Sequence, residues 1–261
     1  MRIALTIAGS DSGGGAGIQA DLKTFQRFGV YGTSAITAIT AQNTRGVDSW
    51  EPVSPQLVRA QMDALASDLP PAAFKTGMLG SGAVAETVAA AIRDHSWSNY
   101  VLDPVMVATS GDLLFEADVV DIIRKQLLPG ASLVTPNLQE ATILCGEEIA
   151  DEDDMARAAE KIVTEMGAHA VLLKGGHLES GSRVVDILYD GDVRAFRGKR
   201  VDTTSTHGTG CTLSAAITAL LANGESLHAA VRRAIDYVQK AIETAPGLGG
   251  GHGPLNHLAP D

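Results

Sequence analysis

The chain has 261 residues, of which 45% are hydrophobic and 20% are charged. These proportions are typical of a folded globular protein and exclude an intrinsically disordered chain. The formal net charge is -11 at pH 7, so the chain lacks the positive surface with which proteins bind nucleic acids, and we expect no DNA or RNA partner. A chain of this length still fits around one large sheet, and we predict a single domain over residues 1–261.

Targeting and redox features favour the cytoplasm. The apolar stretch from Ile3 to Ala8 is too short for the hydrophobic region of a signal peptide, and no cleavage-site pattern follows it. No segment approaches the length of a membrane helix, so we expect no membrane partner. Cys145 and Cys211 are typical of reduced thiols, although the sequence is also compatible with one disulfide.

Short apolar segments alternate with helical patterns along the chain. Residues 1–8 favour a strand, which leads through a glycine-rich turn into a helix with an apolar face at 18–28. Further buried strands are predicted at 34–40, 73–76, 100–104, 132–135 and 170–174. Helices are predicted after Ser54–Pro55, at 119–127 and at 155–166.

The last third of the chain has a different pattern. Residues 184–189 and 193–196, joined by Asp190-Gly191-Asp192, predict a β-hairpin. Helices are predicted at about 209–222 and 226–244, and the five glycines of 247–253 predict a loop or mobile tail. Alternating strands and helices indicate an α/β fold with a mostly parallel sheet covered on both faces.

The first glycine-rich segment, residues 9–17, lies between a strand and a helix, where α/β sheets bind ligands. Residues 15–20, which begin in this segment, fit the loose dinucleotide pattern G-x-G-x-x-A. That interpretation needs an acidic residue after the second strand, and residues 34–44 contain none. A tight turn that merely requires small residues is the alternative.

A second glycine-rich turn, His207 to Thr212, precedes an apolar helix. Small residues at a helix start leave backbone N–H groups free to hold a phosphoryl group, and the helix dipole adds positive potential. Cys211 lies in the first helical turn, where a thiol pKa is commonly lowered, so it is a candidate base. A cysteine that only fills the core is the alternative, and it suits Cys145.

The chain has no P-loop motif, so the cation and the metal ligands of a kinase must lie elsewhere. Lys174 follows a predicted strand and could neutralise phosphates, or it could be an ordinary exposed lysine. Asn137 and Glu140 suit hydrated magnesium, but they equally suit a helix capping box. Asp103, at the end of another strand, is a further candidate.

Four motifs together resemble one family across nearly the whole chain, the hydroxymethylpyrimidine and phosphomethylpyrimidine kinases of the ribokinase-like superfamily. They are residues 9–21, Ala41-Gln42-Asn43-Thr44, Thr135-Pro136-Asn137 with Glu140, and residues 206–212. The resemblance implies a three-layer ribokinase-like α/β fold, a homodimer, and ATP with Mg²⁺. It implies two successive phosphorylations, of the hydroxymethyl group and then of the monophosphate, in thiamin biosynthesis.

The resemblance also implies roles for individual residues. Gly208 and Gly210 belong to the anion hole, Cys211 stands at the base position, and Lys174 assists catalysis. Lys174, Thr209 and Asn137 bind the nucleotide, and Glu140 and Asp103 face the metal. Most sugar kinases of the superfamily carry aspartate at the Cys211 position, and many relatives carry serine at the Gly13 position. The expected substrate contacts are Gly9, Ala16, Asp21, Gln42, Met78 and Val105.

The carboxamide of Gln42 can pair with the donor and acceptor edge of a 4-aminopyrimidine. Three alternatives remain open: a pyridoxine or pyridoxal kinase of the same superfamily, a nicotinamide-dependent oxidoreductase built on residues 9–17, and a non-catalytic pyrimidine-binding regulator.

Overall fold

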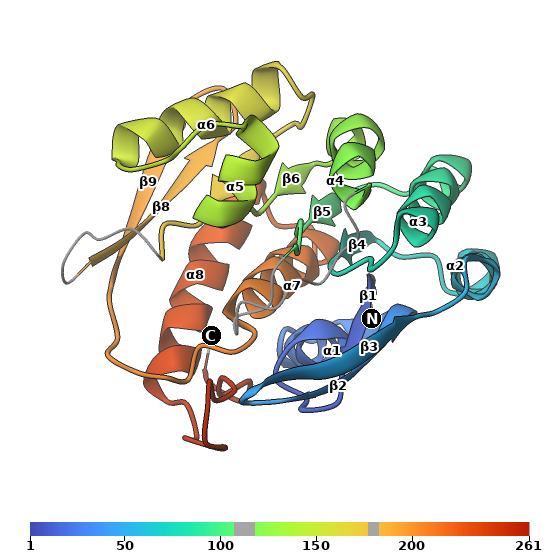
Figure 1. Ribbon diagram of the computed structural model, residues 1–261, viewed down its shortest axis with the longest axis horizontal. Coiled ribbons are helices and arrows are strands. Elements are labelled where there is room, and N and C mark those ends of the chain that lie inside the picture. Colours follow the sequence, from blue (N-terminus) through green and yellow to red (C-terminus); the bar gives the residue numbers. More distant parts are fainter. Residues whose placement is uncertain (107–117, 177–182, 261) are drawn as a thin grey trace.

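The computed structural model describes residues 1–106, 118–176 and 183–260, through which a nine-stranded sheet runs (Figure 1). Its order is β3-β2-β1-β4-β5-β6-β7-β8-β9. Pairings from β2 through β1, β4, β5 and β6 to β7 are parallel, whereas β3, β8 and β9 pair antiparallel at the two edges. The strands are β1 (Ile3–Asp11), β2 (Tyr31–Asn43), β3 (Gly46–Pro52), β4 (Ala73–Thr76), β5 (Tyr100–Leu102), β6 (Leu133–Val134), β7 (Val171–Leu173), β8 (Arg183–Tyr189) and β9 (Val193–Lys199).

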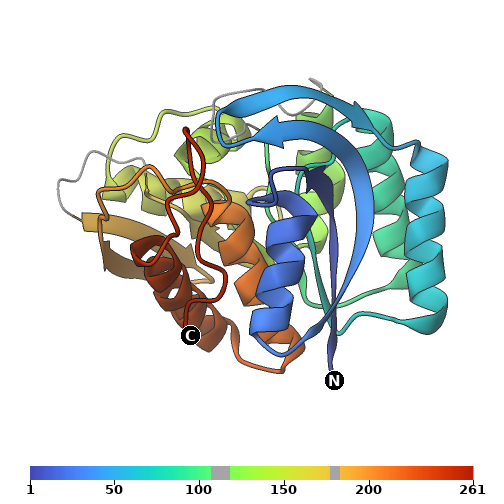
Figure 2. The same cartoon turned by 90° about the horizontal axis from the view of Figure 1, so that it is seen from below.

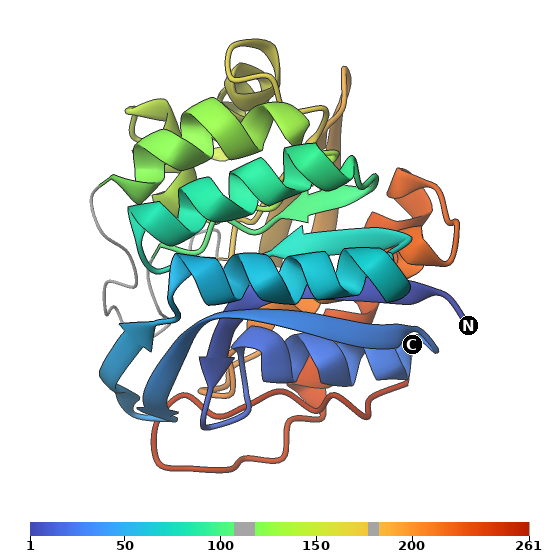
Figure 3. The ribbon, with the colours of Figure 1, turned by 90° about the vertical axis from the view of Figure 1, so that its right-hand side faces the viewer.

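Helices cover both faces of this sheet, which gives three layers (Figures 1 and 3). One core cluster packs α2 to α6 against one face, and a second packs α1, α7 and α8 against the other. Strands β4 to β7 are buried throughout because both of their faces are covered, and this explains the unbroken apolar sequences of β5, β6 and β7. The helices are α1 (Gly17–Arg27), α2 (Pro55–Asp68), α3 (Gly82–His95), α4 (Val119–Ile122), α5 (Leu138–Cys145), α6 (Glu152–Thr164), α7 (Thr209–Ala222) and α8 (Leu227–Glu243), and α4 continues through a π-helical turn (Ile123–Leu127) and a 3₁₀ turn (Leu128–Gly130).

Most predicted elements are confirmed. Strand β4 and helix α7 have the predicted bounds, and Ser54 caps α2 through a hydrogen bond from the Leu57 amide, with Pro55 in the first turn. The predicted strand at 34–40 is longer, because its second half pairs with β3 in a curved hairpin (Figure 2). Strand β3 was not predicted, since it is an exposed, largely polar edge strand.

The order of the strands places a ligand site at the carboxyl end of β1. From β1 the chain passes through α1, on one face, to β2, and it then returns through α2, on the other face, to β4. The connection that leaves β1 and the connection that enters β4 therefore lie on opposite faces of the sheet. Open α/β sheets bind ligands at the carboxyl ends of the strands where the connections separate in this way. The two glycine-rich turns and Lys174 all lie at this edge of the sheet.

The predicted loop at 247–253 is tied to the protein by backbone hydrogen bonds. The His252 amide donates to the Thr44 carbonyl (2.7 Å) and the Gly253 amide to the Thr204 carbonyl (3.2 Å). Farther along, the Arg27 Nε group donates to the carbonyl of Ala259 (2.7 Å), so the C-terminal segment lies against α1 (Figure 2). The segment thus packs beside the glycine-rich turns instead of extending away from them.

The buried His257 of this segment makes stability depend on pH. Its Nε2 lies 3.1 Å from the Thr212 hydroxyl, and burial, with a smaller effect of Lys23, lowers its pKa from 6.5 to about 4. The unfolded chain therefore binds this proton more readily than the folded chain. The lowered pKa of His257 therefore contributes up to roughly 3 kcal/mol to the free energy of unfolding. This contribution is fully present above pH 6.5 and is lost as the pH falls towards 4.

We expect His257→Gln, which cannot titrate, to weaken the fall in unfolding free energy between pH 6.5 and 4. Urea unfolding at several pH values measures this slope. Substitution of the exposed His252 in the same segment is the control. An identical slope in the wild type and His257→Gln would contradict the assignment.

Candidate active site

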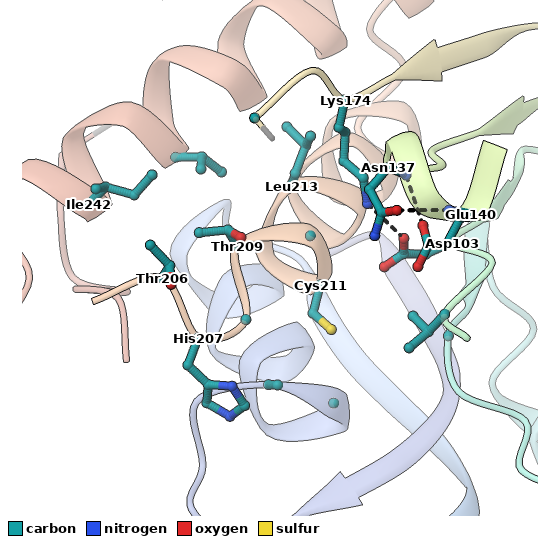
Figure 4. Close-up of a pocket in the computed structure, with 18 of the residues that line it drawn as sticks. Asp103, Asn137, Glu140, Lys174, Thr206, His207, Thr209, Cys211, Leu213 and Ile242 are labelled. Carbon is teal, nitrogen blue, oxygen red and sulfur yellow. Dashed lines mark hydrogen bonds and ion pairs between the residues drawn. The ribbon is translucent and has the colours of Figure 1, made fainter. Parts of the chain in front are cut away.

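A pocket of about 670 Å³ opens at the carboxyl ends of the parallel strands. Figure 4 shows the turn from Thr206 to Cys211 on one side of it, facing the cluster of Lys174, Asp103, Asn137 and Glu140 on the other. All but one of the site residues predicted from sequence line this pocket. Those that do are Gly9, Ala16, Gln42, Met78, Asp103, Val105, Asn137, Glu140, Lys174, Gly208, Thr209, Gly210 and Cys211.

The turn before α7 has the form of an anion-binding site. Gly208 caps the helix with a φ of +81°, and a Cβ at this position would lie 1.9 Å from the carbonyl oxygen of Gly15, so only glycine fits. Among the described residues, the amides of Gly210 and Cys211 have no hydrogen-bond acceptor. Because these groups line the pocket at a helix N-terminus, they can bind a phosphoryl group.

Cys211 lies in the first turn of α7 with its sulfur near the amide of Gly17. We predicted a lowered thiol pKa at this position, and that prediction is wrong. Burial raises the pKa of Cys211 to about 12, and the opposing effects of Lys75 and the Gly17 amide are smaller. The thiol is therefore mostly protonated at neutral pH.

Lys174 follows β7 and is largely buried, so it is not the ordinary exposed lysine that the sequence also allowed. Its ammonium group lies 3.3 Å from Asp103 Oδ1. A Cβ on Gly210 would be 3.0 Å from the same nitrogen, which places the ammonium group beside the anion-binding turn. Asp103 also accepts hydrogen bonds from Thr135 (3.2 Å) and Ser214 (3.1 Å), so its two oxygens are engaged.

Asn137 and Glu140 form the capping box of α5, and both line the pocket. The Asn137 carboxamide accepts from the Glu140 amide (2.9 Å), and Glu140 Oε2 accepts from the Asn137 amide (2.8 Å). Burial raises the Glu140 pKa to about 7, although Lys174 opposes this effect. The helix cap and the magnesium site that the sequence suggested for Asn137 and Glu140 are thus compatible, because the two side chains that cap α5 also line the pocket.

Asp21 is the predicted site residue that does not line the pocket. Its side chain is fully buried beneath it, 2.9 Å from the Lys75 ammonium group and 2.6 Å from the Thr6 hydroxyl. Asp21 lies on the inward face of α1, one turn after Gly17. The structure therefore does not support the expected contact between Asp21 and a substrate ring. Lys75, its partner, lines the pocket instead.

A second polar cluster joins the two glycine-rich turns. Asp11 accepts hydrogen bonds from the amides of Gly13 (2.7 Å), Gly15 (2.9 Å) and Ala16 (2.8 Å), and from His207 Nε2 (2.9 Å). Burial alone would raise its pKa, but these hydrogen bonds, above all that from His207, lower it. The loop at 11–16 is therefore fixed against the anion-binding turn.

Gln42 lies next to this cluster. Its Oε1 accepts from the Thr40 hydroxyl (3.1 Å), and its Nε2 is 3.5 Å from His207 Nε2. Sequence reasoning did not assign roles to Asp11, His207 or Lys75. Lys75 had a detectable signal, because a lysine inside a predicted buried strand requires a charged partner.

The other half of the pocket is largely apolar and was missed from sequence. It lies between the β8–β9 hairpin and α8, and the labelled Ile242 and Leu213 mark it in Figure 4. Its walls come from separate segments with no local motif. The apolar residues concerned are Phe196, Val201, Leu213, Ile235, Val238 and Ile242.

Comparisons with known proteins agree with this architecture. A family model described as phosphomethylpyrimidine kinase matches residues 11–256. A hydroxymethylpyrimidine/phosphomethylpyrimidine kinase of Rhizobium meliloti (strain 1021) is 55% identical over 261 residues, covering 98% of this chain and 97% of the relative.

Two solved structures extend the comparison. An ADP complex of Bacillus subtilis pyridoxal kinase has a TM-score of 0.91 and 40% identity, covering 99% of this chain and 98% of its own. Phosphomethylpyrimidine kinase from Clostridium difficile 630 has a TM-score of 0.83 and 41% identity, covering 93% and 100%.

A mostly parallel sheet covered on both faces, with an anion-binding turn and a lysine in one pocket, defines a small-molecule kinase of the ribokinase-like fold. The predicted fold class is therefore confirmed. The chain belongs to the phosphomethylpyrimidine kinase family.

In the part of the chain that the structure describes, no helix is long and apolar enough to cross a membrane.

Proposed function

We propose that this pocket carries out the two phosphorylations of the family, and that the turn from Gly208 to Cys211 is the observation on which this assignment depends. The chain transfers phosphate from ATP to 4-amino-5-hydroxymethyl-2-methylpyrimidine and then to the resulting monophosphate, which are steps of thiamin biosynthesis. The pocket has the parts that both steps require, because it joins an anion-binding turn to a polar recess and an apolar recess.

The pyrimidine is assigned to the recess beside Gln42. A carboxamide offers a donor and an acceptor, which complement the amino group and ring nitrogen of a 4-aminopyrimidine. Met78 and Val105 offer apolar contact to the ring. Gly9 and Ala16 leave room for the ring, because glycine has no side chain and alanine has only a methyl group. A Cβ on Gly9 would lie 3.1 Å from the Met78 sulfur.

ATP is assigned to the remaining part of the pocket. Its phosphates would contact Thr209, Lys174 and Asn137, and its base would lie on the apolar wall near Leu213 and Ile242. Lys174 can neutralise phosphate charge without moving far, since it already lies beside Gly210.

The donor set also fits a magnesium ion carried by the nucleotide. In the described part of the chain, no three His, Cys, Asp or Glu side chains come together as a metal site. Magnesium needs only one or two carboxylates when phosphates and water complete its shell. We assign the carboxylate that binds magnesium to Glu140, which would help to neutralise the nucleotide phosphates through the ion. Asp103 holds Lys174, since its oxygens are already engaged.

In the proposed reaction the hydroxymethyl oxygen attacks the γ-phosphorus, the new O–P bond forms, and the bond to the ADP oxygen breaks. The hydroxymethyl proton passes to the sulfur of Cys211, which accepts it only in its minor thiolate form, because the thiol is mostly protonated at neutral pH. The amides of Gly210 and Cys211 and the Lys174 ammonium group stabilise the transferring phosphoryl group. Positioning and charge stabilisation supply most of the catalysis in such reactions.

The function is tested by mass spectrometry of 4-amino-5-hydroxymethyl-2-methylpyrimidine incubated with the protein, ATP and Mg²⁺. We expect the monophosphate to form first and the diphosphate to follow. Pyridoxal is assayed in parallel, because a solved pyridoxal kinase shares 40% identity with this chain. Phosphorylation of pyridoxal alone would replace the proposal with that second function, and no product from either alcohol would refute both.

We expect Lys174→Met to raise the KM for ATP at least tenfold and to lower kcat, because one charge-assisted phosphate contact is lost. The KM for the pyrimidine should change little. The variant leaves Asp103 without its cation, so Lys174→Met/Asp103→Asn is measured beside it, with thermal unfolding as the check on folding. Lys125→Met, at an exposed surface pair with Asp121, is the control. An unchanged KM for ATP would rule out the phosphate contact.

We also propose a homodimer in the cytoplasm. Both cysteines are free, which suits a reducing compartment. Tyr31 and Ile39 on β2 and Leu57 on α2 are exposed apolar side chains that could meet a second copy. Sedimentation velocity of the purified chain tests the stoichiometry, and a monomer at micromolar concentration would contradict it.

A further inference from the structure

A buried ion pair beneath the pocket has no role in the mechanism above. Lys75 on β4 and Asp21 on α1 are both fully buried, with 2.9 Å between Nζ and Oδ1. Thr6 on β1 donates a further hydrogen bond to Asp21 (2.6 Å). Removing two ions from water costs several kcal/mol per ion, so such a pair is poorly explained by stability alone.

The cation of the pair belongs to the same pocket as the proposed base. Lys75 and Cys211 line the same pocket, from β4 and from the first turn of α7. The ammonium group interacts electrostatically with the sulfur position, whereas Asp21 lies behind it and does not reach the pocket. The cation is therefore on the side of the pair that faces the reaction.

The other charged groups around Cys211 do not supply the same effect. Asp103, after β5, opposes a negative sulfur, and Lys174, after β7, already pairs with Asp103. Asp21 also opposes the thiolate from α1. Among the described residues that act on Cys211, Lys75 has the largest effect in favour of the negative form.

We propose that Lys75 is a positioning residue that stabilises the thiolate of Cys211, and that Asp21 fixes the ammonium group at the sulfur. The proposal rests on the proposed function of Cys211 as the base. A nearby cation stabilises a thiolate that burial would otherwise disfavour. After the sulfur takes up the substrate proton, Lys75 and Asp21 still neutralise each other, so no buried charge is left alone.

The test measures the thiolate of Cys211 directly, without ATP or pyrimidine. In a Cys145→Ser background, the rate of alkylation by iodoacetamide is followed from pH 7 to 11, since only the thiolate attacks the reagent. The first variant is Lys75→Met/Asp21→Asn, which removes both charges and leaves neither buried partner ionised. The second is Lys75→Gln, whose amide can still donate to Asp21 if the double variant does not fold.

We expect either folded variant to be alkylated at least tenfold more slowly at the same pH below the midpoint, with the profile shifted to higher pH. Lys161→Met, which removes a lysine beside the other cysteine, should leave the profile unchanged. In the phosphorylation assay, kcat should fall at least tenfold with little change in the KM for the pyrimidine.

An unchanged alkylation profile in a folded variant would overturn the proposal. This outcome is separate from a failure of the base assignment, which would appear as full activity of a Cys211 variant whatever its alkylation profile. A purely structural role for Lys75 would lower thermal stability but would not shift the reactivity of the thiol in the folded protein.

Discussion

Cys211→Ala is expected to lower kcat for the first phosphorylation, that of the hydroxymethyl group, by about 10²-fold, at the lower end of the range for general bases. The loss is moderate because phosphoryl transfer depends mainly on positioning and charge, and the amides before Leu213 remain in place. The KM values for ATP and the pyrimidine should change little, since Cys211 is assigned to proton transfer and not to binding. Steady-state kinetics at saturating substrate, with product detection by mass spectrometry, measures the effect.

Cys145→Ala is the matched control for this variant. Cys145 is a buried thiol at the end of α5 that donates weakly to the Ala158 carbonyl (3.8 Å), and it does not line the pocket. Its substitution should lower stability slightly and leave kcat unchanged. If Cys211→Ala retained the wild-type kcat with normal binding, proton transfer would have to be assigned to another group.

Gly208→Ala is expected to lower kcat by about 10² to 10³-fold, as does the loss of a donor from an oxyanion hole. Gly208 has a φ of +81°, and the added methyl group would meet the Gly15 carbonyl oxygen at 1.9 Å. The turn must then move away from residues 15–16, which displaces the amides that bind the phosphoryl group. Kinetics on protein shown by circular dichroism to be folded measures this effect.

Gly224→Ala separates the effect of backbone strain from that of the site. Gly224 has a φ of +90°, but no atom lies within 4 Å of a Cβ placed there. It should lose roughly 1 kcal/mol of stability from the left-handed conformation and keep the wild-type kcat. A folded Gly208→Ala variant with near-normal kcat would remove the anion-binding turn from the mechanism.

Local sequence was sufficient for features whose causes are local. Helix α7 could be placed at 209–222 because glycines precede it and a long apolar segment follows. The cap at Ser54 follows from the short-range preference of a hydroxyl for free helix amides. Strands β5, β6 and β7 were recognisable because burial on both faces favours unbroken apolar residues.

The positions of most site residues were also predictable, because each follows a strand or begins a helix. Lys174 and Asp103 come directly after buried strands, and the carboxyl ends of parallel strands meet at one edge of a sheet. The four motifs then identified the family, as the comparisons confirm. The roles assigned to the individual residues stay predictions.

The sequence by itself determined the class of fold, the edge of the sheet that holds the site and most of the residues at that edge, since these depend on local patterns and motif spacing. Only the tertiary structure decided that Asp21 is buried under Lys75, that His207 joins Asp11 across 196 positions, and that the apolar half of the pocket exists. It also reversed the expected direction of the Cys211 pKa shift. The reason is physical: desolvation and long-range contacts depend on what packs around a group, which no short segment of sequence contains.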